Sequence, residues 1–184
     1  MSLQSPGILI TFRSRSGAAE RLALAAAVGA VQARGSIRLR RMPDDGGEAV
    51  SPHGREILER MRREYTAPSG ADAEWADALV LCGSAGAEAG AWASWLDILT
   101  RLQAGGNLEG KVGAVVVLSS ADAEASTDTA LSWSAALLRL GLVVVPPVTV
   151  VAGGLAPDHD AGRVRAGGRR VVAVARALAR GVDG

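Results

Sequence analysis

The fold is decided by the stretch Gly7-Ile8-Leu9-Ile10-Thr11-Phe12, which runs directly into Arg13-Ser14-Arg15-Ser16-Gly17-Ala18-Ala19. A run of apolar and β-branched residues is typical of a strand that is buried on both faces, as in a parallel sheet. The residues that follow are small or polar, and they lead into a helical pattern from Ala18 to Ala33. The stretch therefore predicts a strand, a short loop and a helix.

The same order of strand and helix repeats along the chain. Further buried strands are predicted at Ala78–Cys82, Val112–Leu118 and Leu142–Val145, the last resuming at Val148–Val151. Helical periodicity covers Trp92–Gln103, Ala130–Leu140 and Ala166–Ala179. Because each connection is long enough for a right-handed crossover, the alternation predicts an α/β fold. We expect a doubly wound five-stranded parallel sheet of order 2-1-3-4-5, with helices on both faces.

The second strand of this sheet is predicted at Ser36–Arg41, where apolar and charged residues alternate as in an edge strand with one wet face. Residues 43–75 are interpreted as an excursion between strands two and three, with a helical segment at Glu56–Arg63 between Pro52 and Pro68. A chain of 184 residues has the usual size of one domain, so a single domain is expected over residues 1–184. Residues 1–3 are set aside as a cloning remnant.

Composition narrows the possible partners and cofactors. The 20 Lys and Arg balance 19 Asp and Glu, so a net charge of +1 favours neither nucleic acid nor an anionic membrane. A single Cys excludes an intramolecular disulfide and a CxxC motif, and two His argue against a His-rich metal site. No targeting or membrane-spanning pattern is seen, which predicts a cytoplasmic protein. The aromatic fraction of 3% leaves few side chains to stack on a cofactor ring.

In an open α/β sheet, ligands bind beyond the carboxyl ends of the strands, which makes the loops after strands one, three and four the candidates. The first loop, with Ser14, Arg15, Ser16, Gly17, Ala18 and Ala19, combines hydroxyls, a glycine and a helix N-terminus, which together bind phosphate. The alternative is an ordinary helix start, with a serine as N-cap and solvated arginines. The loop lacks the GxxxxGKS/T pattern of P-loop NTPases and the GxGxxG pattern of dinucleotide sites.

This loop and several later segments resemble the tryptophan-repressor-binding (WrbA-like) family of flavodoxin-like NAD(P)H:quinone oxidoreductases. The matches follow the family's order at Phe12–Glu20, Arg41-Met42-Pro43, Ala76-Asp77-Ala78, Trp95-Leu96-Asp97, Leu108–Gly113, Leu137-Leu138 with Gly141–Val144, and Ala152-Gly153-Gly154. The resemblance spans Gly7 to about Leu178 and implies a flavodoxin-like fold. It also implies flavin mononucleotide (FMN) as cofactor with its phosphate at Ser14–Ala19, NAD(P)H as electron donor and a quinone as substrate.

The resemblance further implies that the loops after strands three and four hold the flavin ring. The candidate contacts there are Ser84, Ala85, Gly86 and Ala87 after strand three, and Ser119, Ser120, Ala121 and Asp122 after strand four. These loops differ from the family pattern, because residues 83–90 and 119–126 include no aromatic side chain. Ring stacking is worth ~0.5–1.5 kcal/mol per aromatic pair, so FMN is expected to bind more weakly than in the family, mainly through its phosphate.

Other conspicuous residues have structural interpretations. Trp92, Trp95 and Trp133 have helical spacing and are expected to pack on the sheet, with Trp92 as a candidate to stack on the ring. Cys82 ends strand three and is expected to be a buried, inert thiol. The run Asp158-His159-Asp160 is expected to cap a helix rather than to bind a metal. The helix with Arg60, Arg62 and Arg63 is expected to present a solvated face.

Two functions from different classes follow. An FMN-dependent NAD(P)H:quinone oxidoreductase would need no acid or base side chain, because the cofactor carries the two-electron chemistry. Alternatively, the chain is a flavodoxin-fold binding or assembly module that has lost flavin binding. A homodimer is expected rather than the family's tetramer, because the short join Pro146-Pro147-Val148 replaces a long excursion that contributes to the neighbouring-subunit face of the family's pocket.

Overall fold

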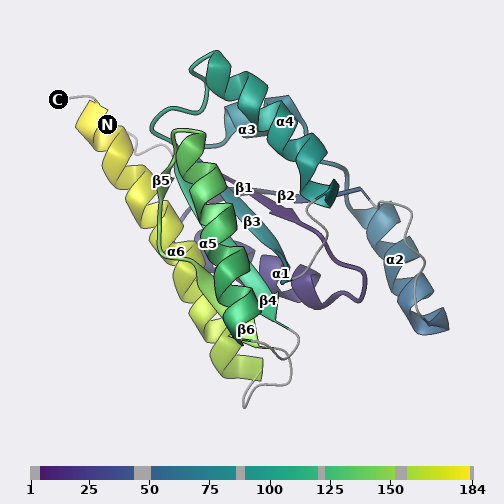
Figure 1. Ribbon diagram of the computed structural model, residues 1–184. Helices are drawn as coiled ribbons and strands as arrows, with labels where there is room; N and C mark the ends of the chain where they lie inside the picture. The colour runs from purple at the N-terminus through teal and green to yellow at the C-terminus, as the bar shows by residue number, and fades with distance from the viewer. Residues whose placement is uncertain (1–4, 44–50, 86–89, 120–122, 152–156, 183–184) are drawn as a thin grey trace.

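The computed structural model describes residues 5–43, 51–85, 90–119, 123–151 and 157–182, in which strands and helices alternate (Figure 1). The strands are β1 (Gly7–Phe12), β2 (Ser36–Arg41), β3 (Ala78–Ser84), β4 (Val112–Ser119), β5 (Val143–Val144) and β6 (Val148–Val151). The helices are α1 (Ala18–Gln32), α2 (Pro52–Glu64), α3 (Gly70–Trp75), α4 (Gly90–Ala104), α5 (Ala123–Arg139) and α6 (Pro157–Val182).

The strands form one parallel sheet in the order β2-β1-β3-β4-β5, which confirms the predicted topology. Every residue of β1 is buried, as are the first six of the seven residues of β3. These strands carry apolar residues on both faces because helices cover both sides of the sheet. Because β1, β3 and β4 are parallel, their carboxyl ends meet at one edge of the sheet, where the predicted loops begin.

The fifth position of the sheet holds two short strands in succession. Val143 of β5 lies opposite Val112 of β4, and Val148 of β6 lies opposite Val116. Between the two ladders, residues 114–115 of β4 face residues 145–147, so the edge contains one extra residue, a bulge. Pro146 and Pro147 lack the N–H that a ladder requires, which explains the interruption of the predicted strand.

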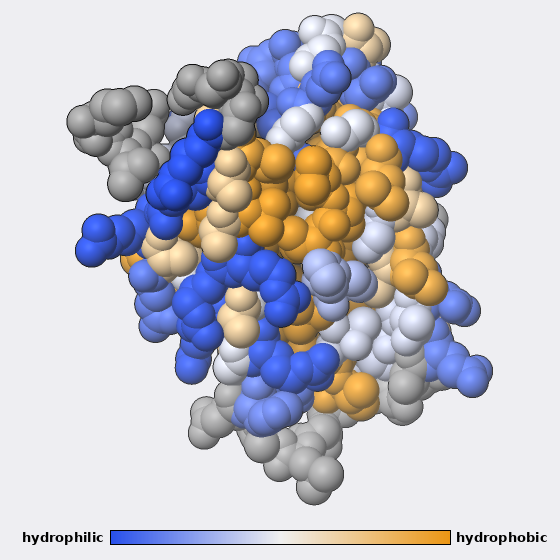
Figure 2. Space-filling view, turned by 90° about the vertical axis from the view of Figure 1, so that its left-hand side faces the viewer, coloured by the Kyte–Doolittle hydropathy of each residue, from blue (hydrophilic) through white to orange (hydrophobic). Residues whose placement is uncertain are grey.

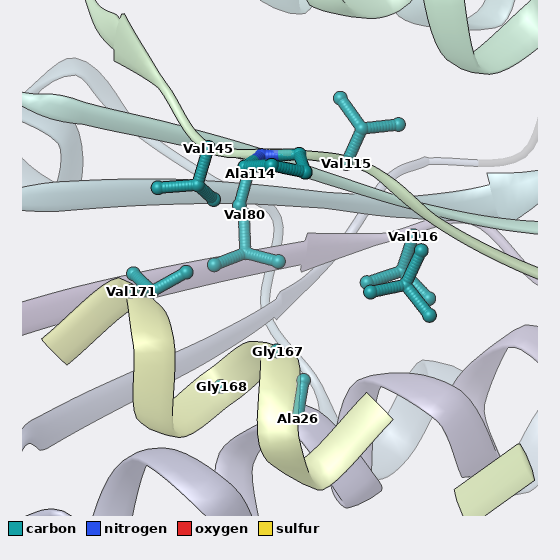
Figure 3. Close-up of a pocket in the computed structure, with 11 residues that line it drawn as sticks. Ala26, Val80, Ala114, Val115, Val116, Val145, Gly167, Gly168 and Val171 are labelled. Carbon is teal, nitrogen blue, oxygen red and sulfur yellow. The ribbon is translucent and has the colours of Figure 1, made fainter. Parts of the chain in front are cut away.

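Beside this interruption lies a small pocket between the sheet and α6 (Figure 3). Val80 and Val145 line it from the sheet, and Gly167 and Gly168 line it from α6. All of its lining residues are apolar or glycine. The pocket offers no group for acid–base or nucleophilic chemistry, so the candidate site remains at the carboxyl edge of the sheet.

Helices cover both faces of the sheet (Figure 1). Ile8, Ile10 and Phe12 of β1 pack with buried residues of α1, α2 and α6, whereas Leu9 packs with those of α3, α4 and α5. The alternation follows from the two-residue repeat of a strand. No helix in the described ranges combines the length and the apolar character that crossing a bilayer requires.

α5 and α6 begin well before their predicted starts, whereas the bounds of α1 agree with the prediction to within one residue. α5 begins at Ala123 instead of Ala130, and α6 begins at Pro157 instead of Ala166, so residues 123–126 are helical rather than part of a loop. α3 is absent from the sequence-based prediction. Ser69 and Asp72 each accept a hydrogen bond from the other's backbone N–H, a capping box that the spacing Ser-x-x-Asp could have indicated.

β2 is the expected edge strand, and its charged face is covered by α3. Asp72 accepts hydrogen bonds from Arg40 Nε and Nη2, at 3.1 and 2.9 Å, and from Arg38 Nη1 at 3.1 Å. Arg38 also lies over the ring of Trp75, 4.1 Å from its centroid, in a cation–π contact. The excursion between β2 and β3 thus packs back onto the sheet edge.

Candidate functional site

The loop between β1 and α1 ends at a helix start without a side-chain cap. Gly17 is the N-cap of α1, and its φ of 79° lies in the left-handed region that favours glycine. The first backbone hydrogen bond of the helix runs from Arg21 N to Gly17 O at 3.1 Å, so the N–H groups of Ala18 and Ala19 take part in no such bond. These donors and the positive end of the helix dipole can bind an anion.

Ser14 lies buried inside this loop. Its side chain is 5% exposed, and its Oγ has no hydrogen-bond partner in the described part of the chain. Its carbonyl oxygen accepts a hydrogen bond from Arg41 Nη2 at 3.5 Å. Arg15 and Ser16 are exposed. The hypothesis of a serine N-cap is therefore wrong, because Gly17 takes that position and no side chain caps the helix.

An ion pair between a buried carboxylate and a half-buried arginine borders the loop. Glu20, in the first turn of α1, is 4% exposed and accepts hydrogen bonds from Arg60 Nη1 at 2.9 Å and Nη2 at 2.5 Å, and from Tyr65 Oη at 2.8 Å. A Cβ built on Gly17 would lie 3.4 Å from Ile57 Cγ2 and 3.5 Å from Glu20 Oε2. α2 and the Glu20 carboxylate therefore form one wall of the loop.

This environment shifts the pKa values of Glu20 and Tyr65, and hydrogen bonds to Glu20 and Glu64 raise the pKa of Arg60. Burial raises the pKa of Glu20, but hydrogen bonds from Arg60 and Tyr65 outweigh burial, so the pKa lies below its ordinary value and the carboxylate stays ionised. Burial and the hydrogen bond to Glu20 raise the pKa of Tyr65 to about 12. The charge of Glu20 is thus held by Arg60 of α2 and by the hydroxyl of Tyr65.

The prediction of a solvated face is confirmed for Arg62 and Arg63, which are exposed, whereas Arg60 is half-buried and pairs with the buried Glu20. The signal that would have revealed the pair lies on α1, where Glu20 shares a helix face with Ala23, Ala27 and Ala30. These alanines are buried, so the face is a buried stripe that includes a carboxylate. A buried charge requires a partner, and Arg60 of the arginine-rich helix supplies one.

The ends of β1 and β2 hold the loop from its other side. Met42 N donates to Phe12 O at 2.8 Å, and Arg41 N donates to Thr66 O at 3.0 Å. The rings of Phe12 and Tyr65 pack edge to face with centroids 4.9 Å apart. The excursion therefore positions the loop through backbone bonds, an aromatic pair and an ion pair.

The segments predicted to hold the ring are described only in part. Ser84 ends β3, Ser119 ends β4 and is buried, and Ala85 N donates to Leu118 O at 2.7 Å. This bond joins the residue that follows β3 to the end of β4 at the carboxyl edge of the sheet. The remaining candidates lie outside the described residues: Gly86, Ala87, Ser120, Ala121 and Asp122.

The tryptophans belong to the core, as their helical spacing predicts. Trp92 is 3% exposed and Trp95 is 1% exposed. The rings of Trp92 and Trp133 lie 4.9 Å apart, and a Cβ on Gly83 would lie 2.6 Å from the ring of Trp133. Trp92 is therefore enclosed by Trp133 and the end of β3, and the hypothesis that it stacks on a ligand ring is wrong for this structure.

The other candidates carry no chemistry. Cys82 is buried, and burial raises the pKa of its thiol, which keeps it protonated and inert. Asp160 lies near His159 and Arg163 in the first turns of α6. No group of three His, Cys, Asp or Glu in the described ranges could hold a metal ion.

Comparison with known structures finds proteins with a similar fold. The chain is similar to a flavodoxin, WrbA-like protein from Agrobacterium tumefaciens, at 18% identity and a TM-score of 0.65, over 94% of this chain and 98% of that one. It is similar to a flavodoxin from the domain Archaea at 15% identity and a TM-score of 0.67, over 92% and 99% of the two chains. An NAD(P)H:quinone oxidoreductase from Methanothermobacter marburgensis is similar at 16% identity and a TM-score of 0.55, over 92% and 96%.

At these identities the likeness shows the fold alone, and the chain has the flavodoxin-like fold. No family model matches the chain, and no curated protein sequence matches it.

Proposed function

We propose that this chain binds FMN at the carboxyl edge of its flavodoxin-like sheet and works as a WrbA-like NAD(P)H:quinone oxidoreductase. One observation carries the proposal. The loop before α1 has a left-handed glycine N-cap, helix N–H groups without backbone partners and a buried Ser14 hydroxyl with no partner in the described part of the chain. These are the donors that a phosphate requires.

The residues of the loop fit the phosphate of FMN. The N–H groups of Ala18 and Ala19 and the hydroxyl of Ser14 would donate to phosphate oxygens. Gly17 allows the loop to take this shape, because its φ of 79° is one that residues with a Cβ rarely adopt. Arg41 is buried and donates to the carbonyl oxygen of Ser14, so it adds positive charge beside the phosphate end of the site.

The part of the site that would hold the flavin ring offers fewer side-chain contacts than the phosphate loop. Residues 83–90 and 119–126 supply backbone groups and hydroxyls but no aromatic side chain, and Trp92 is enclosed. Bound FMN supplies the two-electron chemistry between NAD(P)H and a quinone. The chain's own contribution is to hold the phosphate and to leave the ring accessible at the sheet edge. The activity proposed belongs to a cytoplasmic homodimer.

The same ring end favours a second candidate function. A flavodoxin-fold module that has lost flavin binding would keep the anion-binding loop while its ring-facing loops changed freely. The absence of aromatic residues from both loops is the observation in favour of this alternative.

Titration with three ligands tests both functions. We expect FMN to bind and to compete with inorganic phosphate, and riboflavin, which lacks the phosphate, to bind hardly at all. Protein incubated with FMN should stay yellow after desalting and should oxidise NAD(P)H in the presence of a quinone. Equal affinity for FMN and riboflavin would contradict phosphate-dominated binding, and phosphate binding without binding of either flavin would favour the module.

A further inference from the structure

The outer face of α5 carries an apolar stripe. Leu131, Ala135 and Leu138 follow one another at spacings of four and three residues and so share one side of the helix. All three are exposed, the leucines to 58% and 59%, and Val143 of the adjacent β5 is 43% exposed. Figure 2 views the side on which α6 and β5 lie in Figure 1 and shows a broad apolar area bordered by charged residues.

The stripe is bounded by opposite charges. Asp128 lies three residues before Leu131, and Arg139 directly follows Leu138. Both side chains are exposed, and neither forms an ion pair within the described ranges. At ~100° per residue the two positions differ by about 20° around the helix axis, so they flank the stripe on the same side.

We infer that this face of α5 is a homodimer interface, in which α5 packs antiparallel against α5 of a second copy. A two-fold axis perpendicular to both helices, near Ala135, sets Leu131 against the partner's Leu138. Such an axis brings each flank of the helix next to the same flank of the partner helix. Asp128 of each copy therefore meets the partner's Arg139, and the interface gains two ion pairs.

The lengths agree with this arrangement. With the axis midway between Leu131 and Leu138, a rise of ~1.5 Å per residue places Asp128 and the partner's Arg139 about 3 Å apart along the helix. An extended arginine side chain spans that offset. A parallel pairing would form neither ion pair, because each residue would lie level with its own equivalent.

A second exposed stripe shows why the charges matter. Leu24, Val28 and Val31 of α1 are exposed at the same spacings, but Arg21 and Arg34 bound them. An antiparallel pair of α1 helices would set like charges together. The α1 stripe is therefore a matched control of similar length and hydrophobicity.

Sedimentation equilibrium of the full chain tests the interface. Wild type should show a monomer–dimer equilibrium, and Leu131→Ser with Leu138→Ser should be monomeric over the same concentrations. Leu24→Ser with Val28→Ser should dimerise like wild type. Circular dichroism establishes that each variant is folded. Monomeric wild type, or dimers of the α5 variant with unchanged Kd, would overturn the inference.

The charges provide a sharper test. Asp128→Arg alone and Arg139→Asp alone should each raise the dimer Kd by about tenfold. An equimolar mixture of the two variants should recover the wild-type Kd, because the mixed dimer restores both ion pairs. The two positions lie ~16 Å apart on one helix, so rescue cannot arise within a copy. A mixture as weak as the separate variants would overturn the antiparallel arrangement.

Crosslinking locates the axis. Ala135→Cys should form an intermolecular disulfide on mild oxidation, since the two residues face each other across the axis. Val28→Cys, on α1, is the control and should not crosslink. Cys82 is buried and does not compete. Equal crosslinking of the two variants would overturn the assignment to α5.

Discussion

Gly168 of α6 lies so close to α1 that a Cβ on it would overlap the carbonyl oxygen of Ala26. A Cβ on Gly29 of α1 would in turn overlap the carbonyl oxygen of Arg165. The two helices cross with backbone against backbone, which only glycine allows at both positions. Because α1 begins at the candidate anion-binding loop, this crossing also fixes the direction in which the helix dipole points.

Gly168→Ala is therefore expected to lower the free energy of unfolding by about 1–3 kcal/mol through overpacking, although alanine is the better helix former. Gly162→Ala in the same helix is the control, because no atom lies within 4 Å of a Cβ at that position. It should raise the free energy of unfolding by ~0.5–1 kcal/mol. Urea denaturation of both variants measures the difference, and equal effects would contradict the close crossing.

Glu20 predicts a defined acid sensitivity. Its pKa lies below the ordinary value of 4.5, so its contribution to stability is present above that pH and is lost as the pH falls through the lower pKa of the folded state. Glu20→Gln should lower stability at neutral pH and flatten the fall of stability on the acid side. Glu59→Gln, exposed on α2, should leave the profile as in wild type. Denaturation from pH 3 to 7 provides the comparison.

The sheet was predictable because its central strands are apolar on both faces. The bounds of β1 and β2 agree with the prediction, and strand order follows from right-handed crossovers. The interruption at Pro146-Pro147 was visible in the sequence, but the extra residue of the bulge depends on the register with β4, which no local pattern contains.

The sequence predicted the position of the candidate loop but not the side-chain contacts around it. A glycine after a serine-rich loop indicated the candidate anion site, whereas the N-cap depended on the backbone angle of Gly17. The pairing of Glu20 with Arg60 joins residues 40 apart in sequence. The burial of Trp92 depends on Trp133, which lies on a different helix. Contacts of this kind are set by tertiary packing and not by spacing along the chain.

Lys111, the single lysine of the chain, is expected to be irreplaceable by arginine. Its Nζ donates to the carbonyl oxygens of Ala73, Glu74 and Ala76 at 3.0, 2.8 and 2.6 Å, at the end of α3. A compact ammonium can direct three hydrogen bonds to one helix end, whereas a guanidinium is planar. Burial lowers the pKa of Lys111, although the neighbouring acidic residues oppose this effect.

Both Lys111→Arg and Lys111→Met should lower the free energy of unfolding by about 1–3 kcal/mol. The amides of α3 should also exchange faster with deuterium. Arg101→Met, at an exposed position of α4, is the control and should change neither property. Unchanged stability of Lys111→Arg would show that the three carbonyls are satisfied in another way.

Gly17→Val should abolish binding of both phosphate and FMN. The substitution places a β-branched residue at a φ of 79°, a conformation that such residues rarely adopt, so the loop must change shape. Stability should also fall, because the strained conformation costs about 1–3 kcal/mol. Isothermal titration calorimetry with phosphate and FMN measures the loss, and unchanged affinity would count against the loop as the anion site.

Ser14→Ala should separate ligand binding from stability. Its hydroxyl is buried and has no partner in the described part of the chain, so its removal should leave the ligand-free protein as stable as wild type or up to ~1 kcal/mol more stable. The affinity for FMN and phosphate should fall by about tenfold, the effect of one hydrogen bond to a charged acceptor.

Ser16→Ala is the matched control for Ser14→Ala, since Ser16 lies in the same loop but is exposed. It should change affinity less than Ser14→Ala does. Calorimetric titration and urea denaturation of both variants separate two roles for the Ser14 hydroxyl. Loss of affinity at unchanged stability identifies a group that serves the ligand. A Ser14→Ala variant that keeps its affinity for FMN but unfolds more easily would identify a structural hydroxyl and would remove the observation on which the proposed cofactor site depends.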